Sequence, residues 1–283
     1  MVEVLIDTSI DGIKLLPFLF ITYLIMEYIE HKTSEKSKSI IKKSGRFGPL
    51  IGSILGIVPQ CGFSAAAASL YAGKIITLGT LIAIFLSTSD EMLPILISES
   101  APIGVILKIL LIKFIIGVIF GFIIDIINRI NKKEESKDTI HKLCEHEHCK
   151  CEEGILKSSI KHTLSIFAFI LVITLIFNVA IHFIGEDTLA GFVQNRPILG
   201  PMIAALIGLI PNCASSVILT KLFLTGIINV STMIAGLLAG AGAGMLVLFR
   251  VNKNWKENIS ILALVYIIGV GCGILLQLAG LTL

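Results

Sequence analysis

Two short stretches inside apolar segments carry residue types that a continuous membrane helix seldom contains. They run from Val58 to Ser64 and from Ile210 to Ser216. Each contains a proline, which leaves a backbone carbonyl without its helical partner, followed by an amide, a thiol and hydroxyls. Oxygen and sulfur groups of these kinds are metal ligands. The stretches therefore predict an ion-binding site that contains Pro59, Gln60, Cys61, Ser64, Pro211, Asn212, Cys213, Ser215 and Ser216.

The second stretch repeats the first at a displacement of 152 positions. The proline, the amide, the cysteine and the final serine of one stretch align with those of the other. Small residues of this sort also serve tight helix packing. Packing does not require a proline, an amide and a thiol to recur together, so we favour the site. Broken segments in corresponding halves of a chain are typical of transporter binding sites.

A third polar segment lies within another apolar run and contains Ser87, Thr88, Asp90 and Glu91. Carboxylates inside a membrane indicate a functional role by default. We expect Ser87, Thr88 and both acids to line the site, with Asp90 as an ion ligand or a proton carrier.

Two lysines occur in the apolar run that follows. Lys108 is level with Glu91 if the two runs are antiparallel, and the two side chains could form a buried, structural ion pair. Lys113 lies nearer the middle of its run, and the sequence identifies no partner for it.

The second half differs from the first at this acidic segment. Gly242 and Ala243 occupy the positions of the two acids. A stripe of glycines at four-residue spacing predicts a close-packing helix face there, formed by Gly236, Gly240 and Gly244.

A polar linker joins the two halves and is dense in thiols, imidazoles and carboxylates. Its candidate metal ligands are His141, Cys144, His146, His148, Cys149 and Cys151. Such a tract binds a soft or borderline divalent metal once the ligands are deprotonated. The spacing is not that of a zinc finger, and a solvated linker without metal explains the composition equally well.

These segments belong to a chain with the composition of a membrane protein. Hydrophobic residues make up 55% of the 283 residues and charged residues 15%, and the mean hydropathy is +0.92. We find no phosphate-binding loop of an ATPase and no nucleophile with an assembled base, so the sequence argues against an enzyme. We therefore predict an all-α polytopic membrane protein without a permanently bound cofactor.

Six apolar runs are long enough to cross a bilayer. They are about Ile10 to Ile29, Ile75 to Ile97, Pro102 to Ile127, Ile160 to Ile184, Ile228 to Phe249 and Ile259 to Leu281. The two Pro-interrupted segments, Gly48 to Gly73 and Gly200 to Thr225, would each measure about 39 Å as one helix. That length is too short for two crossings and sufficient for a re-entrant hairpin of two half-helices.

Counting each hairpin as two passes gives ten membrane segments, five in each half. Because five is odd, the second half is inverted relative to the first. Basic loops place the segment from His31 to Arg46, the linker and the loop at Arg250 in the cytoplasm, and the acidic N-terminus outside. The predicted organisation is a first membrane repeat at 1–127, a cytoplasmic His/Cys-rich linker at 128–157 and a second membrane repeat at 158–283, in the cell (inner, cytoplasmic) membrane.

The paired hairpin motifs, the acidic segment and the His/Cys-rich linker resemble a known family. They are similar to the ten-span heavy-metal exporters, relatives of the ArsP-type arsenic efflux permeases, some of which are labelled manganese transporters. The resemblance covers both repeats and implies efflux of a metal or metalloid. It predicts a secondary transporter that works by alternating access at a midplane site between the two broken hairpins.

The identity of the ion stays open between two chemistries. Thiolates suit soft ions such as arsenite-type As(III), Cu(I) or Zn²⁺, whereas carboxylates and carbonyls suit Mn²⁺. We favour a soft metal or metalloid because the thiol occurs in both halves, and Mn²⁺ is the alternative. The expected partners are the lipid bilayer, the ion and protons, with no nucleic acid, and a homo-oligomer is compatible with the sequence.

A protein of another class would use the same cysteines. A membrane thiol–disulfide carrier could pass electrons through Cys61 and Cys213, provided that the two sulfurs approach each other. Such a carrier would not require Asp90, Glu91 or the surrounding amides and hydroxyls.

Overall fold

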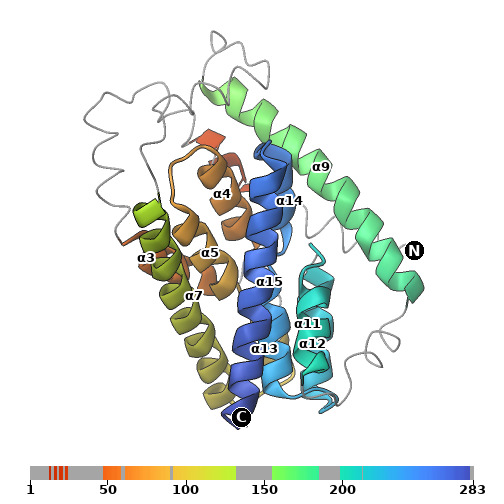
Figure 1. Cartoon of the computed structure of the whole chain (residues 1–283). Helices are drawn as coiled ribbons and strands as arrows, with labels where there is room; N and C mark the ends of the chain where they lie inside the picture. Colours follow the sequence, from red (N-terminus) through yellow and green to blue (C-terminus); the bar gives the residue numbers. More distant parts are fainter. Residues whose placement is uncertain are drawn as a thin grey trace.

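All regular secondary structure in the described part of the chain is helical (Figure 1). The computed structural model describes residues 47–58, 61–89, 92–131, 155–184, 198–211 and 213–280, with isolated positions between 13 and 24. The helices of the first half are α3 (Gly48–Ile57), α4 (Cys61–Ala72), α5 (Leu78–Ser87), α6 (Met92–Ser98) and α7 (Ile103–Asn131). They are followed by α9 (Ile155–Ile184), α11 (Leu199–Gly208), α12 (Cys213–Leu224), α13 (Val230–Ala239), α14 (Ala243–Val251) and α15 (Trp255–Leu278).

The helix boundaries of the two halves correspond at the displacement of 152 positions. The starts of α11 to α15 agree within one residue with those of α3 to α7. Even a capping bond recurs, because the Thr77 side chain accepts from the amide of Thr80 at 3.1 Å and the Asn229 side chain from that of Thr232 at 2.8 Å. The same local chemistry therefore begins α5 and α13.

Four segments of the described chain are long and apolar enough to cross a membrane, and they fall into two kinds. Leu78–Ser98 and Val230–Val251 form the centre, with 75% and 83% of their most apolar window buried. Ile103–Ile130 and Trp255–Leu278 are peripheral, with 22% and 33% buried. Large aliphatic side chains such as Ile103, Leu107 and Leu111 on α7 are exposed, which suits contact with lipid. The expected all-helical membrane architecture agrees with this arrangement.

Both central spans are interrupted near mid-length. In the first, α5 ends at Ser87 and α6 begins at Met92. In the second, α13 ends at Ala239 and α14 begins at Ala243, and Gly242 has φ +50°, a conformation that favours glycine. The glycine stripe predicted for packing is thus only partly a packing face. Gly236 and Gly244 meet neighbouring helices closely, whereas Gly240 lies in the interruption.

The α3–α4 pair folds back along the first central span. Gly48 contacts Thr80 near the start of α5, and Gly56 contacts Ser87 at the end of α5. Hence α3 runs beside α5 in the same direction and stops at the interruption of the central span. Because α4 leads through residues 73–77 into the start of α5, its far end returns to the level of Gly48.

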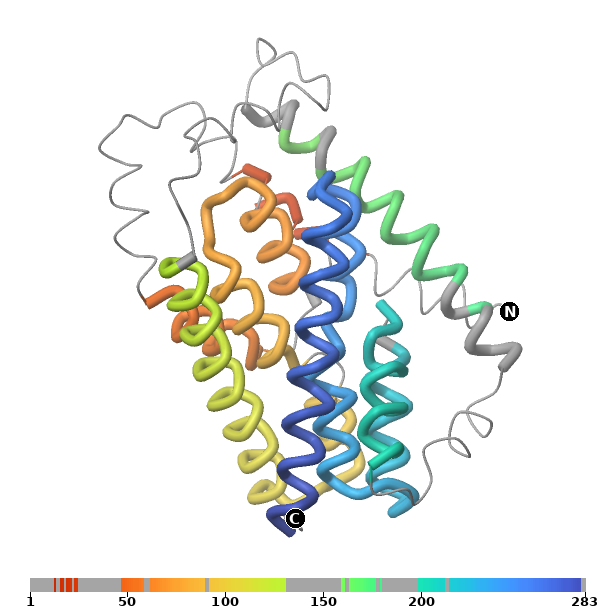
Figure 2. The backbone as a smooth tube through the Cα atoms, in the orientation of Figure 1, coloured from red at the N-terminus to blue at the C-terminus, as the bar shows by residue number. Residues whose placement is uncertain are grey.

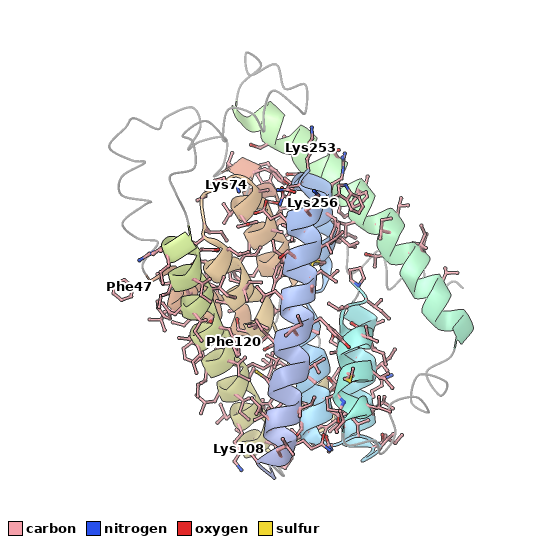
Figure 3. All side chains as sticks on the ribbon, in the orientation of Figure 1. Phe47, Lys74, Lys108, Phe120, Lys253 and Lys256 are labelled. Carbon is pink, nitrogen blue, oxygen red and sulfur yellow. The ribbon has the colours of Figure 1, made fainter. Side chains whose placement is uncertain are left out.

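The two halves interlock through their short helices. The second helix of each pair packs on the other half, α4 against α14 and α12 against α6 (Figure 2). Lys74 and Lys253 lie at one end of the molecule and Lys108 at the opposite end (Figure 3). Since Lys74 precedes the first central span and Lys253 follows the second, the two spans run in opposite directions.

Candidate ion-binding site

A small cavity lies between the interruptions of the two central spans and the helices α11 and α12. The first half contributes Thr88, Ser89 and Met92, at the gap between α5 and α6. The second half contributes residues from α11 to α13 and the gap that follows: Gly208, Ser215, Ser216, Gly236, Leu237 and Gly240. The cavity has room for about one water-sized guest. The structure therefore brings Thr88 together with Ser215 and Ser216, three predicted site residues from different halves.

Three of the four hydroxyl groups around this cavity donate to backbone carbonyls. Thr88 donates to Ile84 at 2.7 Å, Ser89 to Ser87 at 3.1 Å and Ser215 to Ile210 at 3.3 Å. A hydroxyl that donates its proton to a carbonyl keeps an oxygen whose lone pairs can act as a ligand. Polar atoms at this depth are tolerated where they line a cavity of this kind.

Two predicted site residues lie elsewhere. The Ser87 hydroxyl donates to the carbonyls of Ala83 and Ile84 in its own helix, at 2.7 and 3.2 Å. Ser64 is fully buried and packs against the backbone of α14 at Gly244. Neither residue lines the cavity, and both fill tight helix contacts.

Cys61 and Cys213 are the first residues of α4 and α12. A helix N-terminus presents free amides and the positive end of the helix dipole, which stabilise a thiolate. Pro211 precedes α12 and is half-buried. The remaining predicted ligands lie outside the described residues: Pro59, Gln60, Asp90, Glu91, Asn212 and the side chains of both cysteines.

The predicted linker site also lies outside the described residues. This applies to His141, Cys144, His146, His148, Cys149 and Cys151. In the part of the chain that the structure describes, no three histidine, cysteine, aspartate or glutamate side chains gather as a metal site would require.

Lys113 is the functional candidate whose surroundings could not be inferred from the sequence. It is fully buried in α7 and donates to the carbonyl oxygen of Thr88 and, at 3.1 Å, to that of Leu237. Both acceptor residues line the cavity. Lys108 is exposed at the end of the molecule, and because Glu91 lies outside the described residues their pairing stays a prediction (Figure 3).

Asp125 is a buried carboxylate that the sequence analysis missed. It accepts from the Thr77 hydroxyl at 2.7 Å and from the Gly79 amide at 2.8 Å. These groups cap the N-terminus of α5, where a negative charge is favoured. The sequence contains two signals for this contact: Asp125 lies late in one apolar run, and Thr77 is a helix-capping residue type at the start of another.

These features define a class: a helical membrane protein whose two central spans are broken at a polar cavity, as in transporters. The chain belongs to the family described as "Putative, 10TM heavy-metal exporter", which matches residues 1–174 and 150–281. This confirms the resemblance inferred from the sequence motifs. Searches of curated proteins and of solved structures returned no match. This description is that of a multi-pass membrane exporter, which is not an enzyme class.

Proposed function

We propose that this chain is a secondary transporter that exports a heavy metal or metalloid by alternating access at a site between its two halves. The observation that carries the proposal is the cavity to which both halves contribute hydroxyls, Thr88 and Ser89 from one and Ser215 and Ser216 from the other. A site shared between two halves is opened to either side of the membrane when the halves rock against each other.

The proposed architecture is an inverted repeat with two re-entrant hairpins. It is supported by the corresponding helix boundaries, by the opposite directions of the central spans and by the return of α4 to the level of Gly48. In this arrangement the Lys74 end faces the cytoplasm, because Lys74, Lys253 and Lys256 gather there (Figure 3). The N-terminus then lies on the side of the inner membrane that faces away from the cytoplasm.

The proposed ligands combine the cavity hydroxyls with the hairpin residues. Cys61 and Cys213 supply two thiolates at helix N-termini, joined by Gln60, Asn212 and the carbonyls freed by Pro59 and Pro211. Asp90 serves as a ligand or proton carrier. For the linker tract between 141 and 151 we propose capture or sensing of metal, with a solvated linker without metal as the alternative.

The substrate class that this site favours is a soft metal or a metalloid. The Lys113 ammonium lies beside the cavity, since its acceptors Thr88 and Leu237 are lining residues. A fixed positive charge favours a neutral or anionic species such as arsenite-type As(III) over a bare divalent cation, so a soft divalent ion such as Zn²⁺ would need the negative charge of both thiolates. Mn²⁺ is the second candidate, with Asp90 balancing the charge.

Flux into sealed vesicles tests the proposal. Cys61→Ser and Cys213→Ser should each lower As(III) or Zn²⁺ flux by about tenfold or more, because thiolate ligands are replaced by weaker oxygen ligands. The double variant should be little worse than either single one, since one shared site loses its ligand set at the first step.

Two other outcomes would redirect the assignment. Wild-type Mn²⁺ flux that survives both substitutions would overturn the soft-ion proposal in favour of an oxygen-ligand site. A trappable disulfide between Cys61 and Cys213, with no metal flux in the wild type, would instead indicate a thiol–disulfide carrier.

A further inference from the structure

The ammonium of Lys113 lies where the C-terminal ends of two helices from different halves converge. Lys113 is 0% exposed. Among its partners are the backbone carbonyls of Thr88, the C-cap residue of α5, and of Leu237, in the last turn of α13. The side chain therefore bridges the interrupted spans of the two halves.

Converging helix ends of this kind attract a cation for two reasons. The last carbonyls of a helix lack an amide partner within the helix, and the helix dipole adds partial negative charge at the same end. In transporters, unwound carbonyls and half-helix C-termini coordinate the coupling cation. Lys113 is fully buried, so this attraction is screened less than it would be at a surface.

We propose that the converging ends of α5 and α13 form a site for a monovalent cation and that the Lys113 ammonium occupies it in place of a free ion. At the position displaced by 152, the second half has Val265, buried in α15, in place of a lysine. The covalently attached Lys113 ammonium thus balances the partial negative charge at the C-terminal ends of both α5 and α13. This proposal concerns the site of the ammonium and does not depend on which substrate is exported.

The proposal predicts that removing the tether makes the protein respond to small free cations. Lys113→Ala opens the site, and K⁺, Na⁺ or methylammonium should bind there and stabilise the folded state. The thermal unfolding midpoint of the purified variant should rise by about 4 °C, in a saturable manner, when K⁺ replaces choline at constant total salt. The wild type should show no such response, because its site is filled.

Two variants serve as matched controls. Lys108→Ala removes an exposed lysine from the same helix and should leave the midpoint independent of the cation. Lys113→Gln carries a neutral donor on a side chain one bond shorter, fills most of the space and has no charge, so it should be less stable than the wild type and equally unresponsive.

The result that would overturn the proposal is a Lys113→Ala midpoint that does not change among K⁺, Na⁺, methylammonium and choline, or a wild type that responds as strongly. A variant that can be purified only in the presence of a small cation, and unfolds when choline replaces it, would support the proposal. Failure to recover the folded variant in any of these cations would contradict it.

Discussion

Asp125 and Gln277 occupy equivalent positions in α7 and α15, at the displacement of 152, and have different surroundings. Asp125 accepts from the Thr77 hydroxyl and the Gly79 amide. The buried Oε1 atom of Gln277 accepts no hydrogen bond from the described residues. The two halves therefore share a backbone plan and differ in which side chains are used.

Replacing Asp125 should accordingly cost more than replacing Gln277. Asp125→Ala removes a charged acceptor from the Thr77 hydroxyl and the buried Gly79 amide, and we expect it to lower the free energy of unfolding by about 2–3 kcal/mol. Gln277→Ala should cost less than half of that. Unfolding in detergent by denaturant measures both values, and equal losses would show that the capping bonds of Asp125 do not stabilise α5.

At the scale of helices, short contacts between backbones hold the halves together. A Cβ atom added at Gly244 in α14 would lie 2.7 Å from the backbone and Cβ of Ser64 in α4, which is closer than such atoms approach. By contrast, Gly271 in α15 has no heavy atom within 4 Å of the added position. The α4–α14 contact between the halves therefore depends on the absence of one side chain.

The two glycines give a matched pair of substitutions. Gly244→Ala should separate α4 from α14 and lower stability by about 1–3 kcal/mol through overpacking. Gly271→Ala should be neutral or raise stability by up to about 1 kcal/mol, because alanine favours the helix. Thermal unfolding of the purified variants compares them, and a Gly244→Ala midpoint at or above that of Gly271→Ala would exclude a tight contact.

At the scale of the whole molecule, polar contacts join the two halves at the end that contains Lys74. The Tyr71 hydroxyl in α4 donates to Glu257 in α15, and the Lys74 ammonium lies 3.8 Å from the same carboxylate. The corresponding positions of the second half are Phe223 and Gly226, which cannot form these bonds. The polar connection is therefore present at the Lys74 end and has no equivalent at the positions displaced by 152.

The orientation of these two ends can be measured directly. Cysteines introduced at Lys74 and at Glu99 should react with a membrane-impermeant maleimide from opposite sides, Lys74 from the cytoplasm and Glu99 from outside. This follows because one broken span, Leu78–Ser98, separates the two positions. Labelling of the parent chain gives the background from its native cysteines. Reaction of Lys74 from outside and Glu99 from inside would contradict the hairpin topology.

The sequence by itself determined those features that depend on neighbouring residues. Pro59 and Pro211 predict where each hairpin segment is interrupted, and α4 and α12 begin at the cysteines that follow. Hydrophobic composition and run length predict the spans, because each run must match the thickness of the bilayer. These signals act within a few residues of the chain and are legible without the fold.

Only the tertiary structure decided which polar groups meet. Lys113 and Leu237 are 124 positions apart, and the acceptor is a backbone carbonyl, which every residue carries. The interruption at Gly240 could not be predicted from the sequence either. Glycine occurs both in close helix contacts and at helix breaks, so the residue type does not distinguish them. The cavity between Thr88 and Ser216 arises from packing across the halves. Such a contact depends on how whole helices are placed, and no local pattern of residue types specifies it.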